Sequence, residues 1–104
     1  MKANYTPPEG MKGLIADGGT ARVKAVEQLL ASVGGKVEAF YYALGETDAY
    51  VIVEVPDQAS GIALSLTVNA SGLATTSIVP LITPQEIDAA VKMSPLYDAP
   101  GPTA

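Results

Sequence analysis

The sequence contains no cysteine, histidine or tryptophan, and its only arginine is Arg22. The missing cysteines and histidines exclude disulfide bonds, zinc and iron–sulfur sites with those ligands, thiol nucleophiles and every catalytic triad that uses imidazole. The net charge of −5 is the wrong sign for nucleic-acid binding and is unfavourable for anionic membranes. We therefore expect no cofactor, no metal site, no nucleic-acid partner and no membrane partner.

Charged residues are also scarce. They make up 16% of the 104 residues, against about 25% in ordinary soluble domains, while 48% of the residues are hydrophobic. A chain of this length forms one domain with a single two-layer core. Because so few charges cannot cover its surface, we expect the chain to associate with itself as a homodimer or a larger homo-oligomer.

A charge-free stretch separates Asp57 from Glu86. It contains several serines and threonines, an asparagine and Pro80, so it lacks the continuous apolar run of a membrane-spanning helix. We interpret it as a buried helix followed by a strand. The opening residues contain no apolar targeting segment, and we expect a cytoplasmic protein.

Capping residues and apolar periodicity divide the chain into elements. Thr20 and Asp57 are good helix N-caps, and Gly34 and Gly72 stand where helices commonly end. Helical spacing follows Thr20, and runs rich in valine, isoleucine and tyrosine flank a short glycine-containing link that is typical of a hairpin. The pattern predicts, in order, a strand at 3–6, a helical turn at 9–17, a helix at 20–33, strands at 36–44 and 48–55, a helix at 57–71 and a strand at 73–82.

Prolines and a capping box mark the C-terminal part of the chain. Pro80 indicates a sheet edge or a strand end. Thr83 and Glu86 form a capping box with proline at the first helical position, which predicts a short helix through 87–92. We expect a single domain over residues 1–92 and a flexible, proline-rich tail over residues 93–104.

This order of elements predicts the fold class. Strand, helix, strand, strand, helix, strand is the α+β, ferredoxin-like split β-α-β arrangement, a four-stranded antiparallel sheet with two helices on one face. Alternation along the strands places Phe40 and Tyr42 on one face of the sheet and Tyr41 on the other. Since neither face is purely polar, we expect a second copy to cover the face away from the helices.

Several segments resemble a known family. Their order along the chain is similar to that in the GYD-domain family, which is named for a Gly-Tyr-Asp signature. The resemblance implies a ferredoxin-like fold of the dimeric α/β-barrel kind, as found in small bacterial proteins without an established activity. The segments that carry it are Asn4-Tyr5-Thr6-Pro7, Gly18-Gly19-Thr20-Ala21-Arg22, residues 36–52, Pro56-Asp57 and residues 63–72.

Two departures from the family pattern stand out. The glycine and aspartate of the signature fall on Gly45 and Asp48, but Thr47 occupies the position expected for the tyrosine. The resemblance also implies a longer first strand, since relatives carry several more residues before Asn4, so its first half is either missing or lies upstream.

An aromatic cluster and one carboxylate are the candidate ligand site. We interpret the cluster either as a pocket for a small apolar ligand or as packing at a sheet–sheet interface. Asp48 is either a proton-handling or ligand-orienting carboxylate, or a turn residue that bonds the turn's own backbone while Gly45 supplies a positive φ. The candidate pocket consists of Tyr5, Phe40, Tyr42, Asp48 and Tyr50.

Two weaker site hypotheses concern charged ligands. Residues 18–22 are either an anion site near Arg22 or simply a helix cap, and capping is favoured because the P-loop lysine and spacing are absent. A cluster of acidic residues is either a site for a hard cation or a set of solvated charges, and their strand positions favour solvation. The acidic residues are Glu38, Glu46, Asp48 and Glu54.

The helix predicted at 57–71 has two apolar stripes where one is expected. We assign one stripe to the core: Ala59, Ile62, Ala63, Leu66 and Ala70. The opposite, charge-free stripe is then a candidate contact with another subunit, or is covered by Leu96 and Tyr97 of the tail. The candidate interface residues are Ile52, Gly61, Leu64 and Val68.

Two functions from different classes are consistent with these residues. The first is a homo-oligomeric module that binds a small molecule or has a structural role. The alternative is a cofactor-independent enzyme, similar to a monooxygenase or an isomerase, with an aromatic pocket at the sheet face. Without histidine, such an enzyme needs Asp48 or a tyrosine with a strongly shifted pKa for proton transfer.

Overall fold

The computed structural model describes residues 1–101, and the last three residues of the predicted tail at 93–104 lie outside this range. The elements follow the order that the sequence predicts. They are β1 (Lys2–Tyr5), α1 (Glu9–Asp17), α2 (Gly19–Ala31), β2 (Lys36–Tyr42), β3 (Ala49–Glu54), α3 (Gln58–Ala70), β4 (Ala74–Ser77) and α4 (Pro84–Val91).

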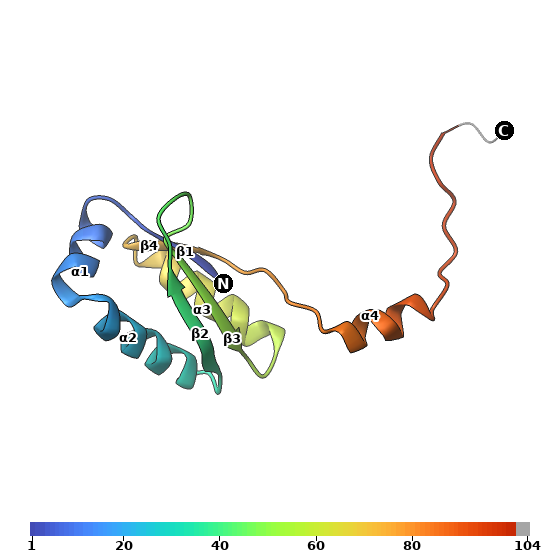
Figure 1. Ribbon diagram of the computed structural model, residues 1–104, viewed down its shortest axis with the longest axis horizontal. Coiled ribbons are helices and arrows are strands. Elements are labelled where there is room, and N and C mark those ends of the chain that lie inside the picture. Colours follow the sequence, from blue (N-terminus) through green and yellow to red (C-terminus); the bar gives the residue numbers. More distant parts are fainter. Residues whose placement is uncertain (102–104) are drawn as a thin grey trace.

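The strands form one antiparallel sheet in the order β2-β3-β1-β4 (Figure 1). The two middle strands, β3 and β1, are distant in the sequence, while β2 and β3 form a hairpin. β4 is an edge strand, as Pro80 indicated. The predicted α+β, ferredoxin-like fold is confirmed, because four antiparallel strands alternate with helices in the split β-α-β order.

Helices α2 and α3 cover the same face of the sheet. Residues opposite each other on neighbouring strands point to one face, and Ala3 lies opposite both Ala49 and Thr76, while Tyr42 also lies opposite Ala49. On this face, the Tyr42 hydroxyl bonds the backbone of α2 and the Thr76 hydroxyl bonds a serine of α3, at 2.9 Å in both cases. We call the opposite side of the sheet the open face.

The core lies between the sheet and these helices. Its fully buried apolar side chains come from α2, the middle strand β3 and α3, and each is at most 2% exposed: Leu30, Ala49, Val51 and Leu64. The charge-free stretch of the sequence forms α3 and β4, as predicted. None of the helices within residues 1–101 has the length and apolar character needed to cross a membrane.

The β2–β3 hairpin confirms the predicted alternation of aromatic residues. Phe40 lies opposite the buried Val51, whereas Tyr41 lies opposite Tyr50 on the open face. A bulge interrupts the register between Val37 and Ala39.

Two of the three predicted helix N-caps are confirmed. The Asp57 carboxylate accepts bonds of 2.7 Å from both the backbone N–H and the hydroxyl of Ser60, and these bonds hold the pKa of this carboxyl below its usual value. The Thr83 hydroxyl accepts a bond of 3.1 Å from the backbone N–H of Glu86. In both cases the cap and its partner are three residues apart, so the sequence alone identifies the contact.

The third predicted N-cap is wrong, because Thr20 lies inside the first turn of α2. The helix begins at Gly19, and Gly18 occupies the cap position with a φ of 81°. This left-handed conformation favours glycine and lets the chain turn from α1 directly into α2. The start of α2 is therefore set by backbone geometry at Gly18 rather than by a side-chain cap.

The orientation predicted for α3 is also wrong. Leu64 is 2% exposed and Gly61 is buried, while Leu66 is 65% exposed and Ile62 is 49% exposed. The stripe assigned to a subunit contact therefore faces the sheet, and the stripe assigned to the core faces outward. Because neither stripe carries a charge, hydropathy could not distinguish them.

The chain after β4 departs from the prediction as well. β4 ends at Ser77 rather than near residue 82, and every residue from Ser77 to Gly101 is exposed. Figure 1 shows α4 standing away from the sheet and the other helices. Leu96 and Tyr97 are fully or largely exposed, so the tail does not cover α3.

Candidate functional site

The signature turn, which contains Gly45 and Asp48, connects β2 to β3 and forms hydrogen bonds with β1. The Asp48 carboxylate accepts a hydrogen bond of 2.9 Å from the backbone N–H of Tyr5, and the N–H of Asp48 donates to the side-chain oxygen of Asn4 at 2.9 Å. The same N–H lies 3.1 Å from the carbonyl oxygen of Ala3. Asp48 therefore binds the neighbouring strand, and not the turn's own backbone as the structural interpretation expected.

Gly45 does not supply the positive φ that was expected of it. The described glycines with positive φ are Gly18, Gly34, Gly72 and Gly101. A Cβ at Gly45 would meet no atom within 4 Å, so this structure places no steric demand on the glycine of the signature. Beside the turn, Thr47 lines a shallow polar hollow of about 370 Å³ together with side chains of β1 and β4.

Three of the five predicted pocket residues lie on the helix-covered face. The rings of Phe40 and Tyr42 are 5.0 Å apart between centroids and tilted by 52°. Tyr5 shares this face, because it lies two residues after Ala3 along β1. Tyr50 does not join them, since it lies opposite Lys2 and Tyr41 on the open face.

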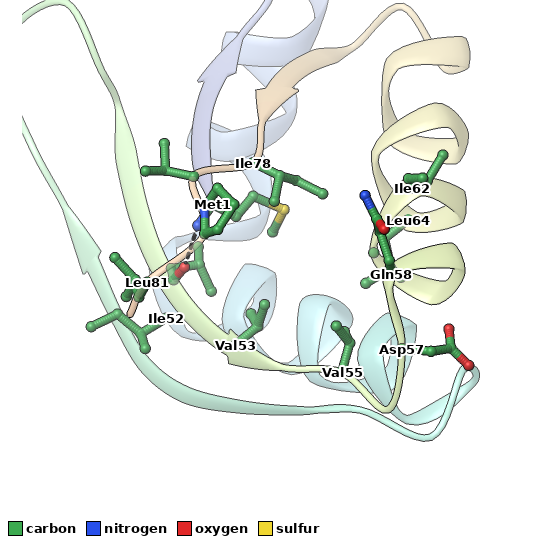
Figure 2. Close-up of a pocket in the computed structure, with 14 residues that line it drawn as sticks. Met1, Ile52, Val53, Val55, Asp57, Gln58, Ile62, Leu64, Ile78 and Leu81 are labelled. Carbon is green, nitrogen blue, oxygen red and sulfur yellow. Dashed lines mark hydrogen bonds between the residues drawn. The ribbon is translucent and has the colours of Figure 1, made fainter. Parts of the chain in front are cut away.

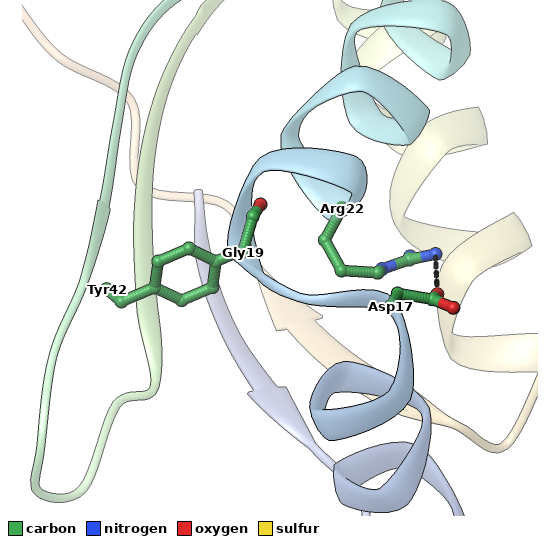
Figure 3. A network of polar contacts seen from close by, with 4 residues as sticks. All are labelled: Asp17, Gly19, Arg22 and Tyr42. Carbon is green, nitrogen blue, oxygen red and sulfur yellow. Dashed lines mark hydrogen bonds and ion pairs between the residues drawn. The ribbon is translucent and has the colours of Figure 1, made fainter.

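Tyr42 is held against the start of α2. Its hydroxyl donates to the carbonyl oxygen of Gly19 at 2.9 Å, and Figure 3 shows the ring directed at this residue. Although Tyr42 is 40% exposed, the partial desolvation of its hydroxyl, followed by the neighbouring Tyr5, raises its pKa to about 12. The phenol is therefore harder to deprotonate than an ordinary tyrosine, and it serves as the hydrogen-bond donor to α2.

The charged-ligand hypotheses find little support in the geometry. Arg22 forms an ion pair of 3.7 Å with Asp17, the last residue of α1 (Figure 3). Glu54 likewise pairs with Lys36 at 3.2 Å on the open face. Within residues 1–101, no three carboxylates come close enough to hold a metal ion.

The predicted interface residues separate into two groups. Ile52 lies on the open face and is 41% exposed. Gly61 and Leu64 are buried on the side of α3 that faces the sheet, and Val68 is half-buried on the same side of this helix. Of the four, only Ile52 is therefore placed where another subunit could reach it.

The sequence analysis missed an apolar groove. It has a volume of about 580 Å³ and lies between β3, the first half of α3 and the segment that follows β4 (Figure 2). Asp57 and Gln58 stand at one end, and the rest of the lining is almost wholly apolar. The sequence predicts a strand through residue 82, but in the structure β4 ends at Ser77. This unpaired strand-like stretch at 78–82 is the sequence signal that could have indicated the groove.

Catalytic chemistry requires a reactive group in a protected place. None of the described residues is a buried polar or charged side chain. Asp48 and Tyr42, the two candidates for proton transfer, both hydrogen-bond to backbone groups of other elements.

Of the comparisons with known proteins, the one with family models gives a match. No curated protein and no solved structure matches this sequence. The family model of the GYD domain matches residues 1–91, a range that contains every helix and strand found in the described residues. The chain therefore belongs to the GYD domain family.

Proposed function

We propose that this GYD-domain chain is a homo-oligomeric module that assembles through the open face of its sheet. The observation that carries the proposal is a group of large apolar side chains on that face. Tyr41, Tyr50 and Ile52 are 69%, 46% and 41% exposed, respectively. Contiguous exposed apolar side chains on a small protein are typical of an interaction surface.

The register of the sheet makes these side chains one patch. Tyr41 lies opposite Tyr50, and Ile52 lies opposite Ala39 on the same face. The ion pair between Lys36 and Glu54 stands at the next position along the hairpin and gives the patch a polar rim. An apolar centre with a polar rim is the usual composition of a protein–protein interface.

The same face favours assembly over catalysis. An enzyme of the alternative kind would require a closed pocket with a buried carboxylate or phenol. The aromatic residues proposed for that pocket are divided between the two faces of the sheet, and Asp48 is occupied by the backbone of β1. Two sheets packed face to face would instead bury Tyr41, Tyr50 and Ile52 together.

The test compares two isoleucines that are both exposed. Ile52→Lys places a charge in the proposed interface, while Ile15→Lys makes the same change on α1, away from the open face. We expect light scattering to give a multiple of the subunit mass for the wild type and Ile15→Lys, and a lower mass for Ile52→Lys. A single-subunit mass for the wild type at micromolar concentration would contradict the proposal.

A further inference from the structure

The side of α3 that turns away from the sheet is apolar and exposed. Leu66 and Ile62 stand at its centre, and they are 65% and 49% exposed, respectively. Three exposed alanines on the same side complete what we call the outer face of α3: Ala59, Ala63 and Ala70. No residue of α3 carries a charge, whereas a helix side that faces water normally does. The outer face is therefore typical of a helix that packs against another element.

α4 has an apolar side that also lacks a partner. Its apolar residues gather on one side and its polar residues on the other: Pro84, Ile87, Ala90 and Val91 against Gln85, Asp88 and Lys92. Ile87 is 49% exposed and Val91 is 72% exposed, and Figure 1 shows α4 standing away from the rest of the molecule. Isolated helices shorter than about 12–15 residues are marginal in water, so this helix of 8 residues needs a surface to pack against.

β4 runs back along α3 and leaves the sheet where α3 begins. The hydroxyls of Thr76 and Ser65 lie 2.9 Å apart, near the middle of α3. Two residues later, Cδ1 of Ile78 lies 3.7 Å from the position of a Cβ at Gly61, one turn nearer the start of that helix. Residues that follow Ile78 in the same direction therefore pass beyond the N-terminal end of α3.

The link to α4 continues in that direction. Pro80 and Pro84 restrict the residues before them to extended conformations, and Thr83 has a φ of −75° and a ψ of 155°. Figure 1 shows the link leading away from the sheet to α4. To cover the outer face of its own α3, the chain would have to reverse its direction within residues 79–83, against the preference of both prolines.

We infer that α4 packs on the outer face of α3 in a second copy of the chain. The apolar side of α4 meets a face without charges, so Glu86 and Asp88 find no carboxylate opposite them. The alanines of the outer face let a helix approach to the usual interaxial distance of about 8–10 Å. The same two acidic residues disfavour an anionic membrane surface as the alternative occupant.

The size of the contact favours a reciprocal exchange between two chains. In a two-fold arrangement each chain provides an arm, residues 84–97, and also receives the partner's arm on α3. The arm includes three further exposed apolar side chains, Met93, Leu96 and Tyr97. An arm and an outer face together supply about 20 residues, which is the number that each partner contributes to a standard interface.

This contact goes beyond the proposed assembly through the open face and does not depend on it. The outer face of α3 and the open face lie on opposite sides of the molecule, since α3 covers the other face of the sheet. A chain that uses both surfaces forms assemblies larger than a dimer.

Cysteine cross-linking tests the contact directly, because the chain has no cysteine of its own. Leu66→Cys and isotope-labelled Val91→Cys are mixed and treated with a thiol-specific reagent that spans about 8–10 Å, the distance between packed helices. We expect mass spectrometry to show a cross-linked heterodimer of the two variants. Gln85→Cys, on the polar side of α4, replaces Val91→Cys in the control and should lose this product.

Charge substitutions give a second, quantitative measurement. They are made together with Ile52→Lys, which weakens the proposed open-face contact, and sedimentation equilibrium gives the dissociation constant. Leu66→Glu and Val91→Glu should each raise it by about tenfold or more, because each buries a charge in the contact. Thr67→Glu and Gln85→Glu add the same charge to exposed positions on α3 and α4 and should leave the dissociation constant unchanged.

Two results would overturn the inference. A cross-link within one chain, in the double variant Leu66→Cys/Val91→Cys, would mean that α4 covers its own α3. Equal yields from Val91→Cys and Gln85→Cys would mean that α4 has no preferred face. If the heterodimer forms while Ile52→Lys leaves the mass unchanged, the arm contact holds and only the open-face proposal fails. If Ile52→Lys lowers the mass and no heterodimer is cross-linked, only the arm contact fails.

Discussion

The Tyr42 hydroxyl donates to the carbonyl oxygen of Gly19 at 2.9 Å, and a Cβ at Gly19 would lie only 3.1 Å from Cε2 of the same ring. The bond and the close approach have one cause, since the ring of β2 lies directly over the first residue of α2. The contact joins residues that are 23 positions apart in the sequence. It ties β2 to the start of α2, and a side chain at Gly19 would require the ring of Tyr42 to shift by a few tenths of an ångström.

The raised pKa of Tyr42 predicts how stability changes at alkaline pH. Burial and Tyr5 raise this pKa to about 12 in the folded state, against about 10 in the unfolded chain. As pH rises from 10 to 12, the unfolded chain loses this proton before the folded chain does, so the free energy of unfolding falls. We expect urea unfolding to show a smaller loss over this range for Tyr42→Phe than for the wild type.

Tyr97 provides the control for this prediction, because it is an exposed tyrosine on the tail. Tyr97→Phe should follow the wild type at every pH. If the free energy of unfolding falls equally for the wild type and Tyr42→Phe over this pH range, the titration of Tyr42 does not contribute to the pH dependence of stability.

The role of Asp48 predicts a graded effect on stability. Asp48→Ala removes the acceptor of the Tyr5 backbone N–H and should cost about 1–3 kcal/mol, because a partly buried donor is left unpaired. Asp48→Asn keeps an acceptor oxygen at this position and should cost less. Glu46→Ala, an exposed change in the same turn, should stay within about 0.5 kcal/mol in chemical denaturation. An Asp48→Ala variant as stable as Glu46→Ala would show that the bond to β1 contributes nothing.

The parts of the fold that the sequence predicts are those that depend on local contacts. The caps at Asp57 and Thr83 each use a partner three residues away, and the hairpin joins strands that are adjacent in the chain. The alternation of Phe40, Tyr41 and Tyr42 survives the bulge, because the bulge precedes all three residues. Such features need no knowledge of the rest of the molecule.

The features that the sequence could not predict depend on distant partners. The length of β4 is limited by the extent of β1, about seventy residues earlier. The candidate pocket failed because Tyr50 and Tyr42 belong to different faces once β3 is paired with both β1 and β2. Composition identifies aromatic residues, but only the register of the strands decides which of them meet.

The orientation of α3 predicts opposite results for two neighbouring leucines. Leu64→Ala should cost about 2–5 kcal/mol, since it opens a cavity in the core. Leu66→Ala changes an exposed side chain and should stay within about 0.5 kcal/mol. Chemical denaturation at low protein concentration, where self-association contributes least, is the appropriate measurement. A larger loss for Leu66→Ala would mean that α3 presents its other face to the sheet.

Two glycines of α1 provide the last prediction. A Cβ at Gly10 would collide with the carbonyl oxygen of Leu73, and this oxygen is held in place because it accepts a bond of 2.9 Å from the N–H of Thr6. Gly10→Ala must therefore displace backbone, and we expect it to cost at least about 1–3 kcal/mol. Gly13 lies one turn later in the same helix, and a Cβ there would meet nothing within 4 Å. Gly13→Ala should stabilise the protein by about 0.5–1 kcal/mol, because alanine favours the helix. Thermal unfolding of the two variants tests the packing of α1 against the start of β4, and equal gains in stability would refute the close approach at Gly10.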